Sequence, residues 1–238
     1  GAGIPSPPIV PVARERPILA SFAQQRLWFL DQLDPGSPAY NVPVAVRLVG
    51  DLDADSLRRA INEVVRRHEV LRTTFVEIDG QPHQAIAASV DIPLSIHDIS
   101  GHDEADHASE ALRHVQADAT RPFDLARGPM IRASLIRLGE REHIIQVTLH
   151  HIAADGWSMG VLTREVAAIY DAFRNGRRSP LPEPTIQYAD FAAWQRDWLR
   201  GDVLDAQLEF WRGRLEGVAT LELPTDRPRP QAISGRGS

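Results

Sequence analysis

The chain has 238 residues, of which 43% are hydrophobic, so it can bury one substantial core or two small ones. Its net charge of -6 argues against nucleic acid as a partner, and the absence of cysteine excludes disulfides and thiolate chemistry within the chain. No apolar run is long enough to cross a membrane, and the first residues lack a signal-peptide pattern. We therefore expect a cytoplasmic protein without membrane contact.

The first part of the chain changes from an irregular segment to a patterned one. Residues 1–17 hold five prolines and no hydrophobic periodicity, which is typical of an extended linker between domains. The residues that follow predict a strand over 41–49 and then a helix capped by Asp53. The inward face of that helix is expected to hold Leu57, Ile61, Val64, Val65 and His68.

Hairpins and helices alternate through the rest of the chain. Strands are expected in two hairpins, over 73–78 with 84–87 and over 130–138 with 143–149. Helices are expected over 103–119, 157–173, 188–199 and 203–215. The proline-rich residues 223–230 cannot continue a helix. This mixture predicts an α+β fold in which helices cover a mixed or antiparallel sheet.

The most informative stretch is the histidine pair that follows the last predicted strand. His150 and His151 precede Asp155 and Gly156, and a predicted helix follows. Because strand side chains alternate, His150 is expected on the face of Gln146 and Thr148. His151 is expected on the opposite, apolar face. A histidine among apolar neighbours loses solvation, which favours the neutral form that a general base needs.

Two other interpretations of the histidine pair compete with catalysis. A histidine on an apolar face is commonly a satisfied core residue. A metal site is the second alternative, but neighbours on a strand point to opposite faces, so His150 and His151 are poorly placed to hold one ion. Asp155 lies across a glycine-containing turn, and no H-E-x-x-H pattern is present. We therefore expect no metal.

The pattern H-H-x-x-x-D-G followed by Trp-Ser resembles the active-site motif of condensation domains of nonribosomal peptide synthetases. Three further segments resemble that family's motifs and stand in its order. They are 21–30 (SFAQQRLWFL), 67–75 (RHEVLRTTF) and 188–195 (YADFAAWQ). The resemblance covers about residues 17–230, nearly the whole chain.

The resemblance implies a domain of two lobes, each like chloramphenicol acetyltransferase, with the histidine motif at their seam. Nothing in this chain resembles the family's later motifs. We therefore expect residues 1–17 to be an inter-domain linker, residues 18–180 the N-terminal lobe and residues 181–223 helices leading toward the second lobe. Residues 224–238 would begin the crossover between lobes or simply end the piece.

The implied reaction is amide-bond formation. An upstream peptidyl carrier domain holds an aminoacyl or peptidyl thioester on phosphopantetheine, and a downstream carrier presents an aminoacyl amine. No cofactor is expected to be bound, because the thioester is already activated. Further implied partners are the adenylation domain of the same module and the second lobe. The lobe alone is expected to be inactive and to self-associate through its uncovered seam.

The resemblance also assigns roles to residues. His151 is the expected catalytic residue, which either removes the amine proton or hydrogen-bonds the tetrahedral intermediate. Gly156 either lets backbone approach the reacting centre or is a simple turn glycine. His150 is expected to be structural. Asp155 is expected to hold the loop through an ion pair with Arg72, or else with Arg67, which belongs to an arginine pair typical of a solvated helix face.

The spelling of the motifs indicates a subtype. Trp157 precedes Ser158, as in condensation rather than epimerisation domains, and the histidine pair is not replaced by the aspartates of heterocyclisation domains. The first two motifs resemble those of the class that joins an L-configured donor to an L-configured acceptor. Two rival functions remain open: a stand-alone acyltransferase, and a non-catalytic recruiting platform on the same fold. The proline-rich start argues against the first, and the intact histidine motif against the second.

Overall fold

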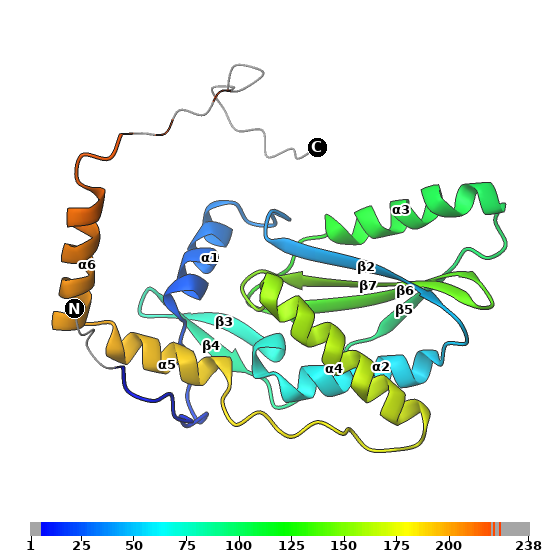
Figure 1. The fold of residues 1–238 in the computed structure, drawn as a ribbon, viewed down its shortest axis with the longest axis horizontal. Coiled ribbons are helices and arrows are strands. Elements are labelled where there is room, and N and C mark those ends of the chain that lie inside the picture. The colour runs from blue at the N-terminus through cyan, green and yellow to red at the C-terminus, as the bar shows by residue number, and fades with distance from the viewer. Residues whose placement is uncertain (1–5, 220, 222–223, 225–238) are drawn as a thin grey trace. The chain divides into compact units, whose positions relative to one another are not determined.

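The computed structural model describes residues 6–219, 221 and 224. The chain divides into two compact units, residues 8–196 and residues 1–7 with 197–238, which we describe separately. The larger unit holds two sheets and their covering helices (Figure 1). The part of the smaller unit that is described holds helix α6 (Asp202–Leu215), on which Phe210 and Trp211 meet edge to face.

The main sheet has four strands in the order β2 (Asn41–Val49), β7 (Glu142–His150), β6 (Ile131–Gly139) and β5 (Leu94–Asp98). β2–β7 and β7–β6 pair antiparallel, whereas β5 and β6 run parallel. The predicted α+β class is therefore confirmed, with a mixed sheet.

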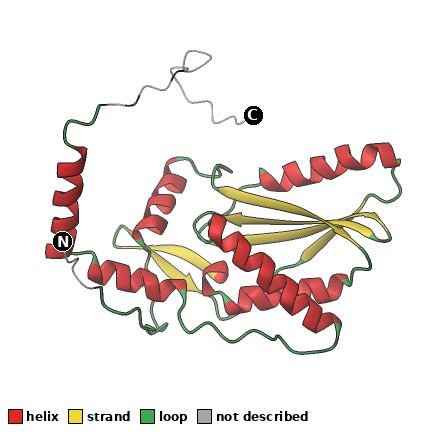
Figure 2. Ribbon diagram, viewed as in Figure 1, coloured by secondary structure: helices red, strands yellow, loops and turns green. Residues whose placement is uncertain are grey.

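Helices cover both faces of the main sheet (Figure 2). On one face, α2 (Ala54–Arg67) and α4 (Gly156–Arg174) pack with the sheet around the largest apolar cluster. On the other face lies α3 (His107–Ala119), which follows the short helix η2 (Glu104–Asp106). The result is a three-layer arrangement with β7 next to its centre, paired on both sides.

A smaller sheet lies beside the main one and consists of β1 (Ile18–Leu19), β4 (Gln81–Ile86) and β3 (Thr73–Ile78). The short helix η1 (Glu69–Arg72) leads into it from α2. Helix α1 (Phe22–Leu33) packs nearby, and helix α5 (Tyr188–Trp198) comes late in the chain. A second apolar cluster joins α1 to this sheet and to the start of β6; it includes Ala20, Leu27, Phe75, Leu125, Met130 and Ile152.

Strand β7 buries both of its faces, and α3 accepts two hydrogen bonds from side chains of the polar face. The Gln146 amide donates to the Val115 carbonyl at 2.9 Å, and the Thr148 hydroxyl donates to an Asp118 carboxylate oxygen at 2.6 Å. The opposite face, with Leu149, belongs to the cluster under α2 and α4. The covering helix thus supplies partners for the Gln146 amide nitrogen and the Thr148 hydroxyl, while the buried Gln146 amide oxygen has no partner among the described residues.

Most predicted elements are confirmed within one or two residues at their ends. Asp53 caps α2 through hydrogen bonds at 3.1 Å from the amides of Asp55 and Ser56. The structure adds β1, β5 and α1, which the sequence patterns do not predict, and it begins β4 at Gln81, three residues earlier than expected. Most of residues 223–230 lie outside the described residues. The predicted linker, lobe and crossover boundaries stay predictions.

Candidate active site

The histidine motif occupies the connection between β7 and α4. The strand ends at His150 and the helix begins at Gly156. The amide of His151 donates to the Tyr40 carbonyl at 2.8 Å, which ties the connection to the segment before β2. The amide of Ala153 then donates to the His150 carbonyl at 2.9 Å, so the chain turns immediately after the strand.

His150 is buried and structural in its contacts, as predicted on the face of Gln146 and Thr148. Its side chain lies among Tyr40 and Phe123, and its Nδ1 accepts a hydrogen bond from the Ile152 amide at 3.1 Å. Burial, with a smaller contribution from neighbouring His151, lowers the pKa of His150 to about 4. The ring is therefore neutral at pH 7, with its proton on Nε2.

His151 is exposed, and its predicted place among apolar neighbours is wrong. The physical reason is that β7 ends at His150, the residue before His151. Beyond His150 the backbone leaves the strand conformation, so the alternation of faces no longer applies to the next residue. His151 is instead exposed to solvent, near Asp155 at the start of α4, whose pKa it helps to lower.

Asp155 is the N-cap of α4. Its carboxylate accepts hydrogen bonds from the Ser158 amide at 2.9 Å and the Ser158 hydroxyl at 2.7 Å, and that hydroxyl accepts from the Asp155 amide. These bonds, the hydroxyl one first, lower the pKa of Asp155. In this capping box the motif's aspartate begins the helix.

The predicted ion pair of Asp155 with an arginine is wrong. Arg72 donates to the Ala87 carbonyl and, at 3.5 Å, to the Arg66 carbonyl. Arg67 has a side chain only 3% exposed, so it does not lie on a solvated face as expected. Its guanidinium meets Glu165 of α4 at 3.1 Å and the Pro182 carbonyl at 2.9 Å.

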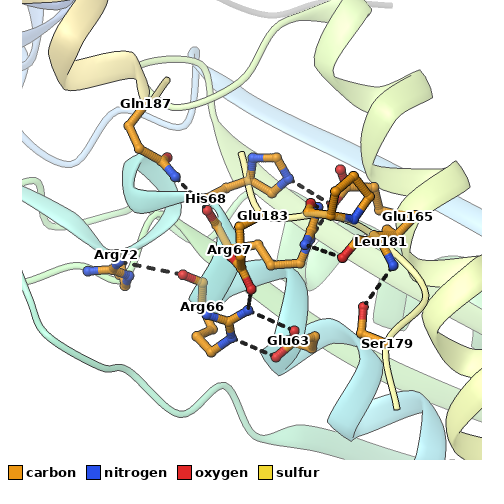
Figure 3. Close-up of polar contacts among 11 residues, drawn as sticks. Glu63, Arg66, Arg67, His68, Arg72, Glu165, Ser179, Leu181, Glu183 and Gln187 are labelled. Atoms are coloured by element: carbon orange, nitrogen blue, oxygen red, sulfur yellow. Dashed lines mark hydrogen bonds and ion pairs between the residues drawn. The ribbon is translucent and has the colours of Figure 1, made fainter. Parts of the chain in front are cut away.

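Glu165 is a polar residue that the motif analysis missed. It accepts from Arg67 and also meets Nε2 of His68 at 2.9 Å, so one carboxylate joins the end of α2 to the middle of α4 (Figure 3). Burial alone would raise the pKa of Glu165, but the hydrogen bonds from Arg67 and His68 lower it. A glutamate on an amphipathic helix carries no sequence signal for such a role, because its partners come from another helix.

Gly156 is the first residue of α4. A Cβ atom built there would meet nothing within 4 Å, and its φ lies outside the left-handed region, so no described neighbour and no backbone conformation requires glycine. The first-turn amides of an α-helix lack helical acceptors and carry partial positive charge. Both predicted roles of Gly156 stay predictions.

A cavity of about 140 Å³ lies beside the motif. Apolar side chains from the end of α2, from β7 and from the first turns of α4 line it, with His68 and Ser158 among them. Trp157, also at its wall, is 83% exposed. Among residues 6–219, 221 and 224, no group of histidine, aspartate or glutamate side chains has the arrangement of a metal site. In that same part of the chain, no helix has the length and hydropathy of a membrane span.

Comparisons with known proteins show the family to which the chain belongs. The family model described as "Condensation domain" matches residues 14–237. One of the linear gramicidin synthase proteins of Brevibacillus parabrevis is 48% identical over 98% of this chain, which covers 3% of that protein. Phosphinothricin tripeptide synthetase PhsC of Streptomyces viridochromogenes is 43% identical over 93% of the chain and 20% of its own length.

Solved structures show the same fold. The X-domain of teicoplanin biosynthesis, solved in complex with OxyB, superimposes with a TM-score of 0.81 at 34% identity, over 96% of this chain and 50% of that one. The starter condensation domain of rhizomide synthetase RzmA gives a TM-score of 0.77 at 20% identity, over 86% and 49%. The chain thus spans about half the length of these solved chains.

Proposed function

The chain belongs to the condensation-domain family of nonribosomal peptide synthetases, and from that premise we propose that it is the N-terminal lobe of a domain that forms amide bonds between carrier-bound substrates. It has the α+β fold of a chloramphenicol acetyltransferase-like lobe. The observation that carries the proposal is the exposed His151 at the junction between β7 and the capped N-terminus of α4.

The protein has few chemical tasks to perform in this reaction. The acceptor amine attacks the carbonyl carbon of the donor thioester, so a C–N bond forms and a tetrahedral intermediate carries negative charge on oxygen. The C–S bond then breaks, the phosphopantetheine thiol of the upstream carrier leaves, and the attacking nitrogen loses a proton. Positioning the two tethered substrates and stabilising this charge are the main tasks.

His151 is the residue we assign to the chemistry. Its exposed imidazole can accept the proton from the attacking amine, or it can hydrogen-bond the intermediate; both remain open. The buried His150 instead supports it from beneath: its ring accepts from the backbone amide of Ile152, the residue after His151. This hydrogen bond holds the turn in which His151 stands.

The first turn of α4 supplies the electrostatic setting. A helix N-terminus favours negative charge close by, and Gly156 stands there without a side chain to obstruct a reacting oxygen. Asp155 acts through structure, because its carboxylate is engaged by Ser158 and begins the helix. Neither Arg72 nor Arg67 contacts the motif's aspartate among the described residues, and we assign them to scaffolding.

The proposed partners are the carriers on both sides, the adenylation domain of the module and the second lobe. Phosphopantetheine enters as part of the substrates, and we propose no bound cofactor. We also propose the L-donor and L-acceptor subtype, which rests on the residues of the first two motifs, 21–30 and 67–75. The cytoplasmic location stays a prediction.

A recruiting platform is the second candidate function. The X-domain, 34% identical to this chain, was solved in complex with another protein, OxyB. If this chain were such a platform, replacing His151 would leave its function unchanged. The intact motif and its capped helix favour catalysis.

Our first prediction concerns His151 in the complete two-lobe domain, since the motif is proposed to lie at the seam between the lobes and the isolated lobe is expected to be inactive. His151→Ala is expected to lower dipeptide formation from loaded carriers by about 10²–10⁴-fold, the usual contribution of a positioned acid–base group, while folding is unchanged. His150→Ala is the matched control. It is expected to lower the melting temperature, and to lower the rate of dipeptide formation less than His151→Ala does. Equal rates for the parent domain and His151→Ala would overturn the assignment.

A further inference from the structure

The segment before β1 is attached to the lobe by a built polar site. We call residues 8–16 the N-terminal arm; it has no regular secondary structure. Within it, the Val12 amide donates to Asp190 Oδ1 at 2.9 Å, and Arg14 forms ion pairs with Asp190 at 2.8 Å and with Glu69 at 2.9 Å. The arm is therefore docked at its middle, where composition alone predicts an extended linker.

Asp190 is the centre of this site. It is 1% exposed, and its second oxygen accepts from the Gln187 amide at 2.7 Å. Burial alone would raise the pKa of Asp190, but the hydrogen bonds from Arg14, Gln187 and Val12 lower it, so the carboxylate is charged at pH 7. Without the arm, this buried carboxylate would lose the cationic partner that offsets the cost of its burial.

The site continues from the arm toward the motif. Gln187 accepts from the Glu69 amide at 3.1 Å and donates to the Arg67 carbonyl at 2.8 Å. The Arg67 guanidinium in turn pairs with Glu165 of α4, as Figure 3 shows together with Gln187. Asp190 belongs to the segment 188–195 and Arg67 and Glu69 to the segment 67–75, two motifs that the proposed chemistry leaves unused.

We propose that Asp190 is a positioning residue that docks the N-terminal arm and, through Gln187 and Arg67, couples the arm to helix α4. Because α4 begins at Gly156, the last residue of the histidine motif, docking of the arm and the position of the motif's helix stabilise each other. Such coupling is reciprocal, so loosening either end loosens the other.

One consequence rests on the proposed function. If an upstream carrier precedes this chain, its tether begins at the docked arm and not at β1. A free segment of the arm's length can extend by about 3.3–3.6 Å per residue, whereas the docked arm fixes where the tether starts. Docking would then favour delivery of the tethered donor by fixing where the tether starts, and the chemical step would not depend on it.

The direct test is amide hydrogen exchange at Val12, measured by NMR on the whole chain. Arg14→Gln is expected to accelerate exchange at Val12 at least about tenfold, and Arg14→Lys, which keeps the charge, by less. Arg16→Gln is the matched control, because Arg16 lies in the same arm, is exposed and has no polar contact in the described structure. Unchanged exchange at Val12 in Arg14→Gln would overturn the docking site.

A second set of variants tests the coupling of the N-terminal arm to α4. Glu165→Gln is expected to accelerate exchange at Val12 several-fold, while Glu140→Gln, at an exposed turn between β6 and β7, is expected to leave it unchanged. Exchange at Val147, in the middle of β7, reports global unfolding. If Val12 does not respond to Glu165→Gln, or responds only in parallel with Val147, the coupling to α4 is wrong.

The final experiment separates delivery from structure in a complete domain fused to its upstream carrier. Arg14→Gln is expected to lower the rate with the carrier-tethered donor several-fold and to leave unchanged the rate with a small pantetheine thioester donor. An equal loss with both donors would overturn the role of docking in donor delivery. An inactive parent would count against the proposed function only, because the exchange measurements still decide the docking and the coupling.

Discussion

His150 and His151 are adjacent, yet only His150 is buried, against Tyr40 and Phe123. The burial of His150 has a thermodynamic consequence, because its pKa falls from 6.5 to about 4 in the folded chain. A histidine with a lowered folded-state pKa binds its proton more weakly in the fold than in the unfolded chain. Its contribution to stability is thus fully present above about pH 6.5 and is lost as the pH falls toward 4.

We therefore predict that the free energy of unfolding falls by up to about 3 kcal/mol between pH 6.5 and pH 4 on account of His150 alone. The variant His150→Asn keeps a hydrogen-bond acceptor near Nδ1 but cannot titrate, so its stability should depend less on pH in this window. Urea unfolding at several pH values measures the difference. His102→Gln, at an exposed position, is the control; an equally flattened profile there would contradict the prediction.

Asp155 offers a prediction that distinguishes capping from ion pairing. Asp155→Ala removes the N-cap of α4 and is expected to cost about 0.5–2 kcal/mol, the usual value for a cap, and not the larger cost of stranding an arginine. Asp53→Ala removes the corresponding cap of α2 and should cost a similar amount. Thermal unfolding of both variants tests this. A loss at Asp155 well above that at Asp53 would indicate a partner beyond the cap.

At the scale of elements, the Glu165 carboxylate of α4 binds Arg67 and His68 at the end of α2. Glu165→Gln leaves Arg67 without its anionic partner while its side chain stays buried, and breaking a buried pair costs about 3–5 kcal/mol. We expect a lower melting temperature, part of which the double variant Arg67→Met with Glu165→Gln should restore because no charge is then stranded. Purely additive losses in the double-mutant cycle would show that the two side chains are not coupled.

The elements that sequence reasoning predicts well are those whose pattern is local. Helix α2 has an aspartate cap and an apolar face, and the hairpin β6–β7 has alternating apolar residues around a turn. Strand β5 escapes prediction because it is short and pairs in parallel with β6, a contact between segments distant in the chain. Helix α1 carries a local signal, the capping box of Ser21 and Gln24, but its apolar residues do not form a clear stripe.

In the site too, features that follow from a local pattern are predictable, and features that depend on distant segments are not. The role of His150 follows from the alternation within its own strand, so it is predictable. The exposure of His151 depends on where the strand ends, and the environment of Arg67 depends on α4 and on the segment at Leu181. Such contacts are decided by packing between distant segments, which a single sequence does not display.

At the scale of the whole molecule, an apolar cavity of about 450 Å³ opens between the edge strand β2 and α4. Its lining includes Val44, Val46 and Leu48 of β2 and Leu162, Val166 and Tyr170 of α4. Val46 is 43% exposed, and β2 pairs on one side only among the described strands. An edge strand beside an apolar surface is a template for association with another chain.

We therefore predict that this chain, produced alone, self-associates through β2. Its mass by light scattering should rise with concentration. Val46→Lys places a charge on the edge and is expected to weaken association at least about tenfold without altering the circular dichroism spectrum. Ile78→Lys, at an exposed apolar residue of β3 in the smaller sheet, adds the same charge and is the matched control. A monomer at all concentrations, or equal effects of the two variants, would count against this surface.

The two faces of β7 differ, and this difference limits where the fold tolerates an insertion or a deletion. Gln146 and Thr148 hydrogen-bond to α3, His150 on the same face meets Phe123, and their neighbours point toward α2 and α4. Inserting or deleting one residue inside the strand would exchange the two sets and present the wrong histidine at its end. Natural variation in length should therefore be confined to the turns outside β7, such as 140–141, while the count of residues from Glu142 to His151 stays constant.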